Sequence, residues 1–141
     1  MTRPPHHDPR LIAVVALGGM VGTTARWALT SAVGVSANGF PTATLIENVV
    51  GSFLLGALLE ALLRRGAESP RGRVLRLGLG TGVLGGFTTF SSLAIELERL
   101  LAAGQVTLAL VYATLSLVLG ILACVVGIAF GSRSRSRADA A

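Results

Sequence analysis

The stretch VTLALVYATLSLVLGILACVVGIAF, residues 106–130, contains no Asp, Glu, Lys, Arg or His. About 20 predominantly apolar residues are enough for an α-helix to cross the hydrocarbon core of a bilayer. The stretch exceeds that length, and it lacks the period-two alternation and the short length of a membrane β-strand. It therefore predicts a transmembrane helix and an all-α membrane protein.

Three further runs share this apolar character, and they cover residues 11–33, 43–63 and 74–101. The chain of 141 residues is 52% hydrophobic and 13% charged, with a mean hydropathy of +0.71, whereas soluble proteins are about one quarter charged. We expect one domain of four transmembrane helices over residues 11–130. We expect residues 1–10 to form a basic tail and residues 131–141 a disordered, basic tail, both on the same side of the membrane.

Charge is distributed unevenly between the two ends of the predicted bundle. All twelve basic residues are arginine, and most of them fall in the two tails and in the connection between the second and third spans. The opposite end carries Arg99, flanked by Glu96 and Glu98. Because cytoplasmic loops carry the excess of basic residues, we expect a multi-pass protein of the bacterial plasma membrane with both termini in the cytoplasm.

Other functional classes have little support in the residues. Basic residues beside membrane spans set topology and contact anionic lipid, and the chain has no platform of aromatic residues and arginines, so no nucleic-acid partner is expected. Both histidines lie in the N-terminal tail, and Cys124 is the only cysteine. With no catalytic arrangement inside the spans, the chain is not expected to be an enzyme.

The stretch GGFTTFSS, residues 85–92, interrupts the third apolar run with two glycines and four hydroxyl side chains. These hydroxyls compete for backbone hydrogen bonds and loosen a helix. The pattern predicts a break near the bilayer centre, where freed carbonyl oxygens must be buried, line a cavity or bind an ion. Two explanations fit this pattern: an ion site, or a simple kink whose free backbone groups bond to neighbouring hydroxyls.

Polar side chains in the other spans include Arg26, Asn48, Tyr112 and Ser116. Such residues are costly in hydrocarbon unless they face a partner or a water-filled path. Tyr112 and Ser116 are four residues apart and so share one helix face. Amide and hydroxyl donors, together with the positive edge of a phenyl ring such as that of Phe90, suit an anion.

Three motifs, ALGGMVGTTARWAL, TLIENVVGSFLLG and GTGVLGGFTTFSSL, resemble those of the Fluc (CrcB) fluoride channels, and the resemblance extends over residues 11–130. It implies an antiparallel dimer with two narrow fluoride pores and passive export of cytoplasmic fluoride. It also implies a structural sodium ion at the dimer centre, which is not transported. Backbone carbonyls of Gly85 and Thr88 from each subunit would hold this ion.

The resemblance also assigns pore residues one at a time. Asn48 corresponds to the pore asparagine, and Phe90, with Ser91 beside it, corresponds to the first phenyl ring that contacts the anion. Tyr112 and Ser116 resemble the polar track of the fourth span. Arg26 matches an arginine whose role is structural or electrostatic.

Two positions depart from the family pattern. Leu93 occupies the place of the second phenyl ring, and Glu47 replaces the usual valine before Asn48. The strong charge bias favours insertion in one orientation, whereas an antiparallel homodimer needs both orientations. We therefore expect an antiparallel heterodimer with a homologous subunit rather than a homodimer.

Two alternatives remain. A small multidrug-type transporter would exchange protons for lipophilic cations at a membrane carboxylate, for which Glu47 and Glu60 are the candidates. Against it, the first span has no Glu. The second alternative is a non-conducting membrane assembly subunit.

Overall fold

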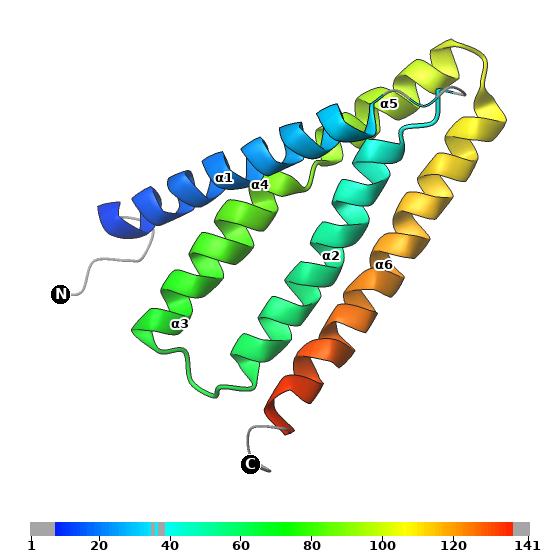
Figure 1. Cartoon of the computed structure of the whole chain (residues 1–141). Coiled ribbons are helices and arrows are strands. Elements are labelled where there is room, and N and C mark those ends of the chain that lie inside the picture. Colours follow the sequence, from blue (N-terminus) through cyan, green and yellow to red (C-terminus); the bar gives the residue numbers. More distant parts are fainter. Residues whose placement is uncertain (1–7, 35, 37–38, 137–141) are drawn as a thin grey trace.

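A computed structural model describes residues 8–34, 36 and 39–136 and shows a bundle of long helices (Figure 1). Within this part of the chain, four helical segments are long and apolar enough to cross a membrane, and no strand occurs. The predicted all-α fold with four membrane spans is confirmed. The four segments are Pro9–Val33, Thr42–Leu63, Pro70–Ala102 and Val106–Ser132.

The first, second and fourth spans are single α-helices, and the third is composite. The single helices are α1 (Pro9–Val33), α2 (Thr42–Leu63) and α6 (Val106–Ser136). The third span comprises α3 (Pro70–Leu75), the π-helical segment η2 (Arg76–Leu84), α4 (Gly85–Phe87) and α5 (Phe90–Ala102).

Local sequence explains where several helices begin. The Asp8 carboxylate accepts a hydrogen bond from the Arg10 backbone N–H at 2.9 Å, and Ser69 accepts one from the Gly72 N–H at 3.0 Å. Each cap precedes a proline in the first turn, where its missing N–H costs nothing.

Helix α6 ends later than expected. It continues through residues 131–136, which the sequence analysis places in a disordered tail. No proline stops it there, and serine and arginine extend a helix that is already formed. The remaining residues of both tails, 1–7 and 137–141, lie outside the described part.

Two close packings organise the bundle. Helix α2 lies beside α6, and α1 lies against η2 and α4 (Figure 1). A β-carbon on Gly86 would lie 2.6 Å from the carbonyl oxygen of Gly19, and one on Gly131 would lie 2.6 Å from that of Ala57. Such contacts require glycine, and they let membrane helices gain packing energy without a hydrophobic driving force.

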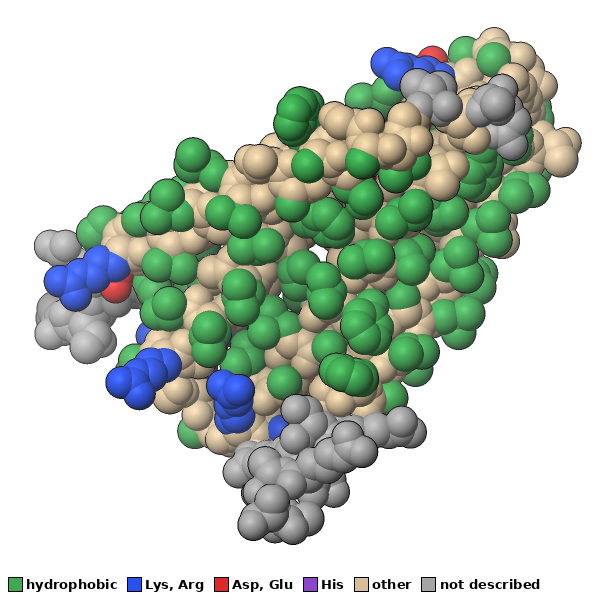
Figure 2. Space-filling model, in the orientation of Figure 1, with side chains coloured by type: hydrophobic (Ala, Val, Ile, Leu, Met, Phe, Trp, Pro, Cys, Tyr) green, Lys and Arg blue, Asp and Glu red, His purple; other side chains and the backbone are tan. Residues whose placement is uncertain are grey.

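The start of α1, the α2–α3 connection and the end of α6 lie at one end of the bundle, and the α1–α2 and α5–α6 connections lie at the other (Figure 1). This arrangement agrees with four antiparallel crossings. Between the ends, the visible flank is covered by hydrophobic side chains, and arginines gather at the ends (Figure 2). Lipid or a partner chain must cover that apolar surface.

Candidate functional site

The helical path of the third span is interrupted at two threonines. Helix α4 ends at Phe87, Thr88 and Thr89 have extended backbone conformations, and α5 begins at Phe90. The Thr88 hydroxyl donates to the Leu84 carbonyl at 2.9 Å, which closes the preceding turn. The Thr89 hydroxyl accepts a hydrogen bond from the Ser92 N–H at 3.1 Å and caps α5. The two hydroxyls therefore end one helix and start the next.

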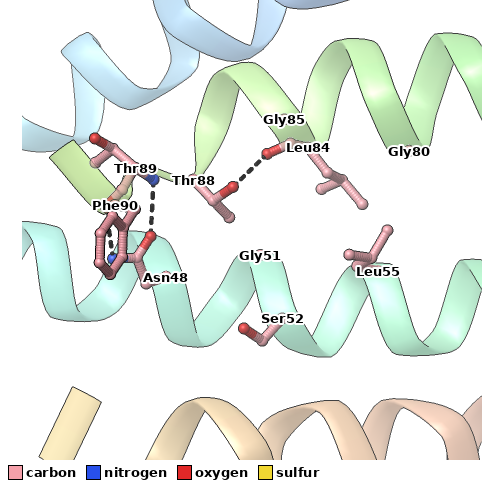
Figure 3. A pocket seen from close by; sticks show the side chains of 10 residues that line it. All are labelled: Asn48, Gly51, Ser52, Leu55, Gly80, Leu84, Gly85, Thr88, Thr89 and Phe90. Atoms are coloured by element: carbon pink, nitrogen blue, oxygen red, sulfur yellow. Dashed lines mark hydrogen bonds between the residues drawn. The ribbon is translucent and has the colours of Figure 1, made fainter. Parts of the chain in front are cut away.

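Asn48 of α2 ties this interruption to its neighbouring helix. Its Nδ2 donates to the Thr89 carbonyl at 3.0 Å, and its Oδ1 accepts from the Thr89 N–H at 2.8 Å (Figure 3). One Nδ2 hydrogen is used in this pair, and the second remains available to another acceptor.

The interruption also changes which donors reach the nearby carbonyls. In a continuous helix the Thr89 N–H would bond to the Gly85 carbonyl and the Ser92 N–H to that of Thr88. Here Asn48 takes the first donor and the Thr89 hydroxyl takes the second. The carbonyl oxygens of Gly85 and Thr88 thereby lose their regular helical partners.

The Gly86 carbonyl receives a replacement partner from α1. Arg26 Nε donates to it at 3.2 Å, and the Thr23 hydroxyl lies 3.5 Å from it. Arg26 thus satisfies a carbonyl whose own helical donor, the Phe90 N–H, lies beyond the interruption. The structure places Arg26 at the break as a backbone partner. Its structural or electrostatic role, which the resemblance implies, stays a prediction.

A cavity of about 290 Å³ opens between α2 and the interrupted span (Figure 3). It brings together four predicted site residues, Asn48, Gly85, Thr88 and Phe90. Phe90 is 80% exposed and lies beside Asn48 in Figure 3. The other lining residues are Gly51, Ser52, Leu55, Gly80, Leu84 and Thr89. The lining thus includes an amide side chain, glycine and threonine residues of the interruption and a phenylalanine.

A second polar cluster joins α2, α5 and α6. The Tyr112 side chain is completely buried, and its hydroxyl donates to Glu96 Oε2 at 2.7 Å. The Thr44 hydroxyl donates to Glu96 Oε1, also at 2.7 Å. The Phe40 ring meets that of Tyr112 edge-on, with 5.5 Å between the centroids. The Glu96 carboxylate in the third span therefore accepts hydrogen bonds from hydroxyl groups of the second and fourth spans.

The remaining predicted pore residues lie outside the cavity of Figure 3. Leu93 packs against the core formed by Leu100, Ala109 and Tyr112. The hydroxyl oxygen of Ser91 lies 3.2 Å from that of Thr89. Ser116 Oγ is buried without a hydrogen-bond partner among the described residues. The predicted residues thus fall into two groups, one at the interruption and one near the α5–α6 contact.

Glu47 points toward α1 rather than into the cavity lined by Asn48. The Glu47 side chain is 1% exposed, and its Oε1 accepts a hydrogen bond from the Thr30 hydroxyl at 2.6 Å. This hydrogen bond links α1 to α2 directly beside the position of Asn48. The alternative transporter carboxylate, Glu60, pairs with Arg64 at the other end of α2.

Three polar residues of these contacts were missed as site residues by the sequence reasoning. Thr30, Thr44 and Glu96 all bond across helices. Glu96 had a usable signal, because it follows Ser92 by one helical turn and so continues the polar face of GGFTTFSS. Because Glu96 lies close to Arg99 in the sequence, it was instead interpreted as part of the charged end of the bundle.

Comparison with known proteins adds to this geometry. The family model described as "CrcB-like protein, Camphor Resistance (CrcB)" matches residues 13–128. The chain belongs to the CrcB family. A Deinococcus radiodurans protein named Fluoride-specific ion channel FluC is 50% identical over 121 residues, which cover 84% of this chain and 93% of the relative.

Two further CrcB relatives carry similar names. Fluoride-specific ion channel FluC 2 of Leifsonia xyli is 42% identical over 129 residues, covering 92% of this chain and 88% of the relative. Fluoride-specific ion channel FluC of Thermus thermophilus is 48% identical over 101 residues, covering 71% and 78%. The match therefore includes the interrupted span and both polar clusters, which lie within residues 13–128.

Proposed function

We propose that this CrcB-family chain is a subunit of a fluoride-specific channel that lets cytoplasmic fluoride leave the cell passively. The observation that carries the proposal is the fixed amide of Asn48 in the cavity of Figure 3. An anion that sheds water needs donors already oriented toward it, because these replace its hydration without reorganisation. The names of the relatives support fluoride as the anion.

Two stations for the anion follow from the two polar groups. At the first, the free Nδ2 hydrogen of Asn48 and the edge of the Phe90 ring face an ion in the cavity. At the second, Ser116 supplies a hydroxyl that has no hydrogen-bond partner in the described part of the chain, and Tyr112 supplies a hydroxyl that donates to Glu96. An ion at the second station must compete with the Glu96 carboxylate for the hydrogen bond that the Tyr112 hydroxyl donates. Ser91 and Leu93 lie on α5 between the stations.

A sodium ion fits the interruption by the chemistry of its donors. The carbonyl oxygens of Gly85 and Thr88 have lost their helical donors, and hard cations accept oxygen ligands. Among the described residues, no group of three His, Cys, Asp or Glu side chains offers another metal site. Bound there, the ion would supply positive charge that holds the extended segment together; it would not be transported. Two carbonyls are too few for a cation, so a second subunit would supply the others.

The exposed ring of Phe90 supports a dimer, because a phenyl group beside a polar cavity needs a covering surface. We propose an antiparallel partner that is a homologous, differing subunit, since the arginine bias favours one orientation for this chain. The same bias supports cytoplasmic termini, and we propose that the protein lies in the bacterial plasma membrane. The chain performs no chemistry on its ion.

Growth of a fluoride-sensitive bacterial strain tests the proposal. We expect the chain, expressed together with its homologous partner, to restore growth in fluoride, and Asn48→Asp to abolish the rescue at equal expression. Rescue by this chain alone would support a homodimer in place of the heterodimer. No rescue in either combination, with both proteins in the membrane, would contradict the channel function.

A further inference from the structure

A second, larger cavity lies at the end of the bundle where α2 passes into α3. Its volume is about 590 Å³, and it shares no residue with the cavity beside Asn48. Its apolar part is made of leucines: Leu59, Leu62, Leu63 and Leu75. Its polar part includes Arg65, Arg71, Arg76, Glu68 and Ser69. The cavity therefore has a charged rim and a hydrocarbon wall.

The arginines at this end divide into paired and unpaired groups. Arg73 and Arg76 donate to the two oxygens of Glu68, at 3.1 and 2.7 Å. Within the described part of the chain, Arg65 and Arg71 form no ion pair or side-chain hydrogen bond. Both unpaired arginines are among the residues that line the cavity.

Glu68 does not cancel this positive charge. Both of its carboxylate oxygens are already engaged, one by each paired arginine. The hydrogen bond from Arg76, followed by that from Arg73, lowers the pKa of Glu68 below its ordinary value. Glu68 therefore stays ionised and bound to its own partners, and two guanidiniums are left to attract an anion.

The leucine wall restricts which anion fits. Leu63 is 74% exposed, and the wall continues into the apolar flank of the transmembrane helices. Figure 2 shows arginine side chains at this end of the molecule, directly beside the hydrophobic flank. A guanidinium binds a phosphate group through two parallel N–H donors, and a neighbouring apolar wall suits acyl chains. A small soluble phosphate would leave that wall uncovered.

We propose that this cavity binds an anionic phospholipid. Its phosphodiester lies between Arg65 and Arg71, and its acyl chains lie along Leu59, Leu63 and Leu75. The site is separate from the ion path proposed above, since no residue lines both this cavity and that of Figure 3.

Native mass spectrometry of the purified full-length chain tests the site, with phosphatidylglycerol and phosphatidylcholine of identical acyl chains as probes. We expect the chain to retain phosphatidylglycerol in preference to phosphatidylcholine. The variant Arg65→Gln with Arg71→Gln should bind phosphatidylglycerol more weakly, by about fivefold for each arginine removed. The matched control, Arg10→Gln with Arg99→Gln, loses the same charge away from the cavity and should bind as the unmodified chain does.

Three results would overturn the proposal: equal retention of both lipids, an equal loss in the control variant, or displacement of the lipid by soluble glycerol phosphate. Equal loss in the control would mean that diffuse charge attracts the lipid. Displacement would mean a site for soluble phosphate. If the double variant does not fold, the single variants and the lipid preference of the unmodified chain decide the outcome.

Discussion

Asn48 and the peptide group of Thr89 form a closed pair of hydrogen bonds, with Nδ2 donating to the carbonyl at 3.0 Å and Oδ1 accepting from the N–H at 2.8 Å. The pair has one stable orientation, because a flipped amide would set donor against donor and acceptor against acceptor. The free Nδ2 hydrogen is therefore fixed as well, and the interruption of the helix positions a donor before any ion arrives.

Asn48→Asp keeps the acceptor for the Thr89 N–H but replaces the donor with a carboxylate oxygen. That oxygen would face the Thr89 carbonyl and repel an anion in the cavity. We expect fluoride efflux from liposomes to fall by at least about tenfold, which corresponds to ~1.4 kcal/mol at the barrier. Ser132→Ala, near the end of α6, is the control. Efflux unchanged by Asn48→Asp would rule out the donor role.

Arg26→Leu removes the Nε donor of the Gly86 carbonyl and leaves that carbonyl with the weak contact from Thr23. We expect the free energy of unfolding to fall by about 1.5–3 kcal/mol, the range for hydrogen bonds that involve a charged group. Thermal unfolding in detergent measures the change. Arg10→Leu, at the exposed start of the same helix, is the control, and an equal loss in both variants would contradict the role of Arg26.

The contact between Glu47 and Thr30 predicts different effects for two substitutions of Glu47. Glu47→Gln keeps an oxygen that accepts from the Thr30 hydroxyl, so fluoride efflux and stability should stay close to those of the unmodified chain. Glu47→Leu removes the acceptor and should cost about 1 kcal/mol of unfolding free energy. A double-mutant cycle with Thr30→Val measures the coupling between the two side chains. Additive losses in the cycle would show that the hydrogen bond contributes nothing.

Sodium held at the carbonyls of Gly85 and Thr88 predicts a stability that depends on the cation present. A ligand that binds the folded state alone raises the free energy of unfolding, by ~2.7 kcal/mol at a hundredfold excess over its dissociation constant, and so raises the unfolding temperature. Unfolding of the assembled protein in sodium chloride is compared with unfolding in N-methylglucamine chloride at equal ionic strength. Equal unfolding temperatures would exclude a sodium site.

The four spans were predictable because the bilayer sets the length of an apolar helix regardless of its neighbours. Inside the stretch GGFTTFSS, the backbone is extended at Thr88 and Thr89, and the hydroxyls of these two residues form hydrogen bonds with nearby backbone groups. The depth of this interruption in the membrane stays a prediction. The end of α6 was misplaced because a polar composition alone does not stop a helix that is already formed.

Contacts between distant residues were not predictable in the same way. The pairing of Asn48 with Thr89 joins residues 41 positions apart, and Thr44 with Glu96 spans 52. Only the packing of α2 beside the interrupted span sets these pairs. Glu96 was assigned to a charged end on the strength of its neighbours in sequence, whereas the fold turns it toward Tyr112.

The channel function is best tested by fluoride efflux from liposomes that contain the purified chain, with and without its homologous partner. We expect fluoride efflux without chloride efflux once the partner is present, and loss of fluoride efflux in Asn48→Asp. Absence of fluoride efflux from liposomes in which both subunits are folded and assembled would show that the chain is not a subunit of a fluoride channel.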